Sequence, residues 1–273
     1  MRIDELESGR VRQALVFMER EPLGNLRMVW ALRTWGLFNL GLAEQGHYLA
    51  AVDTQGIYGL LLHNNNDMWR LAAAGETARA LAEEALFRWG LPHVLAGPED
   101  EVEALLEGVP SLARAVEHRE EEVTLSLSAE DFHTRRVGGE PACEEDLEDL
   151  VALERMLQTE LLGSCAEGWI IRSQMMRALE GSAALVRCDG RVVAKAEIEA
   201  ATPRVDELGG VYTVPDMRRR RFASSACTLV CASSLAQGKK VRLETQRDNE
   251  VAIELYERLG FKRLWPHLAV RFA

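Results

Sequence analysis

A run of four arginines, Arg218 to Arg221, separates an apolar stretch from an amphipathic one in the C-terminal third of the chain. The apolar stretch, Val211 to Val214, is typical of a β-strand, and Pro215 ends it because proline has no N–H for a neighbouring strand. Apolar residues then recur with helical spacing, so the arginines lie at a predicted helix N-terminus. The unpaired N–H groups of that turn and the guanidinium groups could bind a phosphate. A solvated basic turn is the alternative interpretation.

The elements around the arginine run follow a simple order. The helix that begins after the arginines extends to about Ala236, and alternating apolar residues predict a strand over 241–245. A second helix begins after Asp248 or Asn249, which are good N-caps, and ends at Gly260. This order predicts a right-handed β-α-β crossover followed by one more helix.

These elements resemble the acyl-CoA-binding core of the GNAT N-acetyltransferase superfamily, over roughly Thr134 to the C-terminus. In that family, a strand ending V-x-x-x-P or V-Y-T-x-P leads into a Q/R-x-x-G-x-G/A loop whose amides hold the coenzyme A pyrophosphate. Arg218 stands at the Q/R position, Arg221 at the first Gly and Ala223 at the final position. The later signature N-x-x-A-x-x-L-Y-E-x-x-G-F is matched by Asn249, Ala252, Leu255, Tyr256, Glu257, Gly260 and Phe261.

The arginine loop departs from the family pattern at Arg219 and Arg221, where glycine is common. Glycine suits a backbone that approaches a ligand closely or adopts a positive φ. The arginine side chains could instead bind phosphate oxygens, or they could fill the site. The resemblance implies acetyl-CoA binding by Val211, Tyr212, Thr213, Val214, Arg218, Arg219, Arg220, Arg221, Phe222, Ala223, Ser224, Asn249, Ala252 and Tyr256.

The reaction that the resemblance implies is direct transfer of an acetyl group from acetyl-CoA to an amine. The amine must lose a proton, the thioester carbonyl needs a hydrogen-bond donor, and the departing thiolate benefits from protonation. Tyr256 is the predicted acid, because a phenol with a pKa of about 10 stays protonated at neutral pH; packing is its alternative role. The N–H groups near Val211 to Thr213 are expected to polarise the carbonyl. Glu207 is the first candidate for the base, followed by Glu197 and Glu199, which share one strand face.

Composition restricts the partners. The net charge of −11 argues against a nucleic acid, whose phosphate backbone would be repelled. The sequence has neither a run of about 18 apolar residues nor an N-terminal signal region, so we expect a cytoplasmic protein without membrane contact. Five cysteines lack paired metal spacing, fit a reduced compartment and predict no metal. The expected partners are acetyl-CoA and an amine, and the sequence leaves a homodimer open.

The chain length favours two domains, 1–130 and 131–273, with a seam at 128–139. The first domain is predicted to run helix, hairpin, strand, helix, strand, helix, strand, as the second does. No Q/R-x-x-G-x-G/A loop follows its central strand, so it resembles a degenerate GNAT repeat. The predicted fold class is therefore α/β, with two GNAT-like domains in tandem, each a mostly antiparallel mixed sheet flanked by helices.

The second domain is predicted to begin with two helices, Asp146–Leu157 and Ile170–Leu179, before a hairpin that turns at Asp189-Gly190. In the superfamily the first two helices and their connection shape the acceptor pocket. Residues 161–168 and Trp169 could therefore face the acceptor, although a core position is favoured for Trp169.

A catalytically silent module is the alternative to an enzyme. The missing loop of the first domain and the missing glycines of the second favour a pseudo-acetyltransferase that binds acyl-CoA or a partner protein. Tyr256 and Asn249 favour the enzyme. A small amine, an amino acid and a protein amine all remain open as the acceptor, because a fold does not determine function.

Overall fold

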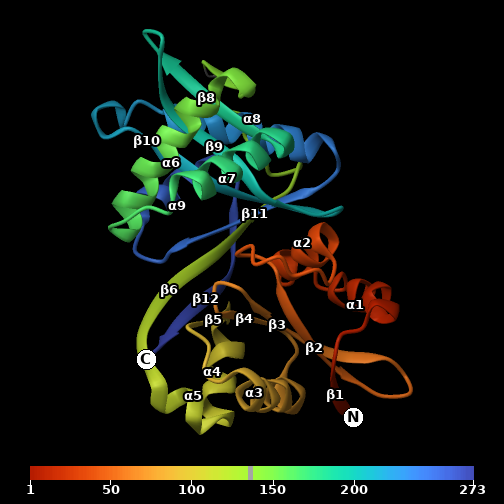
Figure 1. The fold of residues 1–273 in the computed structure, drawn as a ribbon. Helices are drawn as coiled ribbons and strands as arrows, with labels where there is room; N and C mark the ends of the chain where they lie inside the picture. Colours follow the sequence, from red (N-terminus) through yellow and green to blue (C-terminus); the bar gives the residue numbers. More distant parts are fainter. Residues whose placement is uncertain (135–137) are drawn as a thin grey trace. The chain divides into compact units, whose positions relative to one another are not determined.

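The computed structural model describes residues 1–134 and 138–273, so the predicted seam lies partly outside the described residues. The chain divides into two compact units (Figure 1). Unit 1 comprises Met1–Thr124, Glu244–Asp248 and Leu264–Ala273, and unit 2 comprises the described residues of Leu125–Leu243 and Asn249–Arg263. Both combine helices with a mostly antiparallel sheet, which confirms the predicted α/β class. Among the described residues, no helix has both the length and the apolar character needed to cross a bilayer.

Unit 1 has a central sheet with helices on both faces. Its strands have the order β1-β2-β3-β4-β5-β12-β6, and β4 and β5 are parallel neighbours joined through α3. The elements are β1 (Arg2–Glu5), α1 (Val11–Met18), α2 (Leu26–Trp35), β2 (Gly46–Val52), β3 (Ile57–Asn64), β4 (Met68–Ala72), α3 (Gly75–Trp89), β5 (Val94–Pro98), α4 (Glu99–Gly108), α5 (Pro110–Ala115), β6 (Val116–Leu127) and β12 (Lys262–Phe272).

Successive side chains of a strand point to opposite faces of its sheet, so the sheet of unit 1 has one hydrophobic core on each face. Leu49 and Leu61 belong to the core under α3, α4 and α5. Leu60 and Leu62 belong to the core under α1 and α2. The predicted hairpin of β2 and β3 is confirmed, and its turn is closed by hydrogen bonds to Asp53 from Gln55 and to Gly56 from Asp53.

The C-terminal strand completes unit 1. β12 runs antiparallel to β5, and Leu268, Val270 and Phe272 are buried in the core with α3 and α4. No strand was expected at 262–272 from the sequence. The first 130 residues therefore do not contain all of the core of unit 1. That residues 1–130 and 131–273 are separate domains stays a prediction.

Unit 2 has the order of elements that the sequence predicted. Its strands are arranged β11-β10-β9-β8-β7, with β10 and β11 parallel across α8, as expected for a β-α-β crossover. The predicted turn between β8 and β9 is confirmed, and Asp189 and Gly190 both have positive φ there. The elements are β7 (Gly139–Pro141), α6 (Leu147–Leu162), α7 (Gly168–Gly181), β8 (Ala183–Cys188), β9 (Arg191–Ala201), β10 (Val205–Thr213), α8 (Phe222–Ala236), β11 (Lys240–Gln246) and α9 (Glu250–Leu259).

We expect Leu268→Ala to lower the free energy of unfolding by about 2–5 kcal/mol, because it leaves a cavity in the core of unit 1. Urea unfolding followed by circular dichroism measures this loss. Leu264→Ala is the matched control on the same strand, since Leu264 is 40% exposed, and it should change stability little. Equal losses for the two variants would show that β12 does not carry the core.

Candidate active site

Strand β10 pairs with its two neighbouring strands over different lengths. It pairs with β9 from Asp206 to Thr213, but with β11 only from Val205 to Glu207. Beyond Glu207, the β11-facing edge of β10 has no partner strand among the described residues. A β-bulge interrupts the pairing with β9 at Gly209 to Tyr212. An open main-chain edge beside a bulge is a position where an extended ligand can add hydrogen bonds.

The glycines of the bulge make room for charged side chains of β9. A Cβ on Gly209 would lie 2.1 Å from Oε1 of Glu199, and one on Gly210 would lie 2.7 Å from Nζ of Lys195 and from Cδ of Glu197. Gly210 has a φ of +56° and donates its N–H to Glu199 Oε1 at 2.9 Å. Glu197 and Glu199 therefore lie on one face of β9, as predicted, and that face is directed at the bulge.

A buried ion cluster connects this face to α6. Lys195 Nζ lies 2.9 Å from Glu154 Oε2 and 2.9 Å from Glu197 Oε2, and the lysine is completely buried. Burial raises the pKa of Glu197, although Lys195 acts in the opposite direction. Burial would lower the pKa of Lys195, but Glu197 and Glu154 outweigh it and its pKa is raised. A buried charge without such partners would be strongly destabilising, so the cluster fixes β9 against α6.

Glu207, the first candidate for the base, is also buried. Its Oε1 lies 3.4 Å from the guanidinium of Arg242, which is itself buried on β11. Glu199 is exposed, in contrast to both Glu197 and Glu207. The three predicted carboxylates thus have three different environments, and only Glu197 and Glu199 adjoin the bulge.

The arginine loop has the backbone shape that glycines would favour. After the 3₁₀ turn Pro215–Met217, Arg219 and Arg221 have φ of +63° and +67°. Helix α8 begins at Phe222 without a side-chain cap. The first-turn N–H groups of a helix have no partner within the helix, so they are directed at whatever occupies this turn. Both residues thus adopt the left-handed conformation that glycine favours, although neither is glycine.

Arg218 is held by a network within unit 2. Its guanidinium donates to both carboxylate oxygens of Glu160 on α6, at 2.8 and 2.6 Å, and to the carbonyl of Thr213 at 3.0 Å. The Tyr212 hydroxyl donates to Glu160 at 3.2 Å. The hydrogen bond from Arg218 holds the pKa of Glu160 below its ordinary value. Sequence reasoning missed Glu160, because its signal is a single exposed glutamate at the end of a helix.

The other three arginines are exposed. The Arg220 guanidinium stacks over the Phe222 ring at 5.2 Å. Among the described residues, no carboxylate lies within ion-pair distance of Arg219 or Arg221. Two cations on a protein of net charge −11 are therefore available to an anion at the start of α8.

The predicted residues of α9 have different roles. Asn249 caps the helix, since its side chain accepts the Ala252 N–H at 3.2 Å. Tyr256 is buried, and its ring meets the Phe261 ring edge-on at 5.7 Å. Burial raises the pKa of Tyr256, with smaller contributions from Cys227, Cys231 and Glu199. The phenol therefore stays protonated over the physiological range, as its predicted role requires.

The position of Trp169 differs from the one expected from the sequence. A core position was favoured from the sequence, but the side chain is 66% exposed at the start of α7, and Leu161 at the end of α6 is 67% exposed. The core of these two helices is instead formed by Leu150, Ile171, Met175 and Ala178. Trp169 and Ile171 lie two residues apart and therefore on nearly opposite faces of α7, and spacing alone does not show which of these faces is covered.

The chain matches one protein-family model, and its fold is similar to those of several solved structures. Residues 150–261 match the model of the acetyltransferase (GNAT) family, and no curated protein matches the sequence. An acetyltransferase from the GNAT family of Colwellia psychrerythraea is 14% identical with a TM-score of 0.65, and the match covers 100% of both chains. A Drosophila protein is 12% identical with a TM-score of 0.70 over 99% of this chain and 98% of its own.

A tandem GNAT protein from the clavulanic acid biosynthesis pathway is also similar. It is 13% identical with a TM-score of 0.63, and the match covers 99% of this chain and 98% of that protein. Because identities this low carry information about fold alone, the likeness confirms the predicted architecture of two GNAT-like halves in tandem.

We expect Arg219→Gly and Arg221→Gly each to raise the free energy of unfolding by roughly 0.5–1 kcal/mol, because both remove a left-handed L-residue. Arg220→Gly is the matched control: its φ is not positive, and the substitution removes the contact with Phe222, so it should not stabilise. Urea midpoints of the three variants test this. If Arg220→Gly is as stable as the other two, the loop conformation carries no cost.

Proposed function

We propose that this chain, in which residues 150–261 match the acetyltransferase (GNAT) family model, is an N-acetyltransferase that transfers an acetyl group from acetyl-CoA directly to an amine. The family model supports acyl transfer in general. The observation that carries the finer proposal is the loop before α8, where Arg219 and Arg221 keep the left-handed backbone of a glycine-containing phosphate loop. The reaction would take place in unit 2.

The donor is proposed to bind along β10 and at the start of α8. The pantetheine chain of coenzyme A contains amides, and the edge of β10 beyond Glu207 offers main-chain groups without a strand partner. The pyrophosphate would accept hydrogen bonds from the first-turn N–H groups of α8, where the helix dipole favours an anion. Arg219 and Arg221 would add charge-assisted bonds. Arg218 would have to exchange Glu160 for a phosphate before it could take part.

The acetyl transfer needs an acid and a base on opposite sides of the reacting carbon. Tyr256 is proposed to donate a proton to the departing thiolate, because its buried phenol stays protonated. Glu199 is proposed to accept the amine proton, directly or through water, since it is exposed and lies at the bulge. Glu197 could take part only by leaving Lys195, and the ion pair of Glu207 with Arg242 fits a structural role better. The thioester carbonyl would accept a main-chain N–H of Val211 to Thr213.

Acetyl-CoA should stabilise the full chain if this site binds it. At 100 times its Kd, a ligand that binds only the folded state adds about 2.7 kcal/mol to the free energy of unfolding. Thermal unfolding with acetyl-CoA and with CoA measures the effect, and thiol release in the presence of an amine panel measures transfer. An unchanged melting temperature in millimolar ligand would exclude the donor assignment. If acetyl-CoA raises the melting temperature but no amine of the panel causes thiol release, the chain binds acyl-CoA without transferring the acetyl group to those amines.

Tyr256→Phe should lower kcat by about 10²–10⁴-fold while the affinity for acetyl-CoA changes little, because only the proton donor is removed. Tyr58→Phe is the control, since Tyr58 is a half-exposed phenol in unit 1. Steady-state kinetics with the best amine of the panel gives both parameters. Equal kcat values for Tyr256→Phe and the unmodified chain would leave Tyr256 with a packing role only.

A further inference from the structure

One arginine of the loop before α8 is already bound to an anion, and that anion belongs to the protein. Both carboxylate oxygens of Glu160 accept hydrogen bonds from Arg218, at 2.8 and 2.6 Å. The Arg218 guanidinium also lies over the Tyr212 ring, at 5.6 Å, and the Tyr212 hydroxyl donates to the same carboxylate. The contact therefore joins the loop to α6 and to β10 within unit 2.

The helix that carries Glu160 does not favour a carboxylate at this position. Glu160 lies in the last turn of α6, which contains no basic residue. Carbonyl groups without a helical partner make this end of a helix negative, so a carboxylate is unfavourable there unless a cation faces it. Arg218 is that cation, and its hydrogen bond holds the pKa of Glu160 below the ordinary value. The contact with Arg218 thus accounts for a glutamate that the helix itself disfavours.

The contact is also open to exchange. The side chains of Arg218 and Glu160 are 42% and 44% exposed. An exposed ion pair favours its closed form by no more than about fivefold. A phosphate offers more acceptor oxygens than a carboxylate, and a guanidinium binds either of them through two parallel hydrogen bonds. A phosphate that reaches this loop can therefore compete with Glu160 for the same guanidinium.

The neighbours of Arg218 differ from it in their partners. Arg219 and Arg221 have positive φ, and no carboxylate lies within ion-pair distance of either in the part of the chain that the structure describes. Their charges are available to an anion at the start of α8. Arg218 belongs to the same loop, but Glu160 neutralises it.

We propose that Glu160 is an internal competitor of the donor, which occupies Arg218 until the pyrophosphate of coenzyme A displaces it. The inference rests on the proposed function, because that function places the pyrophosphate at the start of α8. Glu160 and a pyrophosphate at one guanidinium would bring like charges together, which is unfavourable. The competition lowers the affinity for the donor, since only chains with Arg218 free present the complete site. Donor binding in turn releases the Glu160 carboxylate at the end of α6.

Calorimetric titration of the full chain with CoA tests the competition. Glu160→Gln keeps the shape of the side chain and removes its charge, so it should lower the Kd for CoA by roughly 3–10-fold. Glu160→Ala should also lower the Kd, and it replaces the glutamine variant if that variant does not fold. Arg218→Gln should raise the Kd. In the Arg218→Gln background, Glu160→Gln should change the Kd by less than about twofold, because the two side chains act through one contact.

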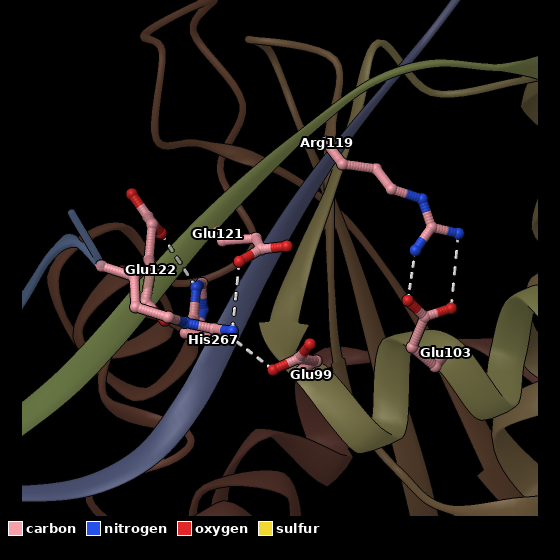
Figure 2. A network of polar contacts seen from close by, with 7 residues as sticks. Glu99, Glu103, Arg119, Glu121, Glu122 and His267 are labelled. Atoms are coloured by element: carbon pink, nitrogen blue, oxygen red, sulfur yellow. Dashed lines mark hydrogen bonds and ion pairs between the residues drawn. The ribbon is translucent and has the colours of Figure 1, made fainter.

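Two glutamine variants control for the loss of one negative charge. Glu148→Gln breaks an exposed ion pair with Arg172 on the same helix, α6. Glu103→Gln breaks the ion pair with Arg119 in unit 1, which Figure 2 shows. The side chains of Arg119 and Glu103 are 45% and 38% exposed, close to the values for Arg218 and Glu160. Both control variants should leave the Kd for CoA unchanged.

The outcomes separate the competition from the proposed function. If the unmodified chain binds CoA and Glu160→Gln binds it no more tightly, the competition is overturned and the donor site stands. Weaker binding by Glu160→Gln would overturn it in favour of a carboxylate that positions Arg218 for the donor. Equal tightening by Glu148→Gln or Glu103→Gln would overturn it in favour of diffuse repulsion. If neither the unmodified chain nor the Glu160 variants bind CoA, the donor site and the competition both fall.

Discussion

Unit 2 depends on one constraint, that β10 pairs with β9 over most of its length and with β11 only at its beginning. The early end of the pairing leaves an open main-chain edge, and the bulge at Gly209 and Gly210 displaces β10 so that charged side chains of β9 can reach it. Glycine is required there because Glu197, Glu199 and Lys195 occupy the space of a Cβ. The same strand then leads into the arginine loop and α8, so a single strand positions the proposed thioester, carboxylate and phosphate sites.

Buried polar groups join neighbouring elements in both units. In unit 2, Lys195 is satisfied by Glu154 and Glu197, and the cluster holds β9 against α6. Breaking such a pair by removing one partner typically costs about 3–5 kcal/mol, so the rigidity of the bulge depends on it. In unit 1, the buried His267 lies between the carboxylates of Glu122 and Glu244, at 2.9 and 3.3 Å, and joins β12 to β6 and to β11.

The sequence predicted the elements of unit 2 and the hairpins of both units, because their periodicities and turn residues are strong and local. It did not predict β12, since 262–272 contains Pro266 and its partner β5 lies far away in the sequence. For the proposed site, the motif residues pointed to the loop and to Tyr256, and both stay predictions. Glu160, Glu154 and Lys195 were missed because each acquires its role only from contacts across elements, and Trp169 was misplaced because helical spacing does not fix which face is covered.

The position of β12 has a consequence for synthesis of the protein. Unit 1 needs residues 264–273, which follow all of unit 2 in the sequence, so its core stays incomplete while unit 2 is translated. At about 5–20 residues per second, the 149 residues that separate Thr124 from Ala273 take roughly 7–30 s. During that interval β5 exposes an unpaired edge on the nascent chain, where a chaperone or another nascent copy could bind. Completion of unit 1 thereby waits for the synthesis of unit 2, and premature termination before residue 264 would damage the part of the protein that was made first.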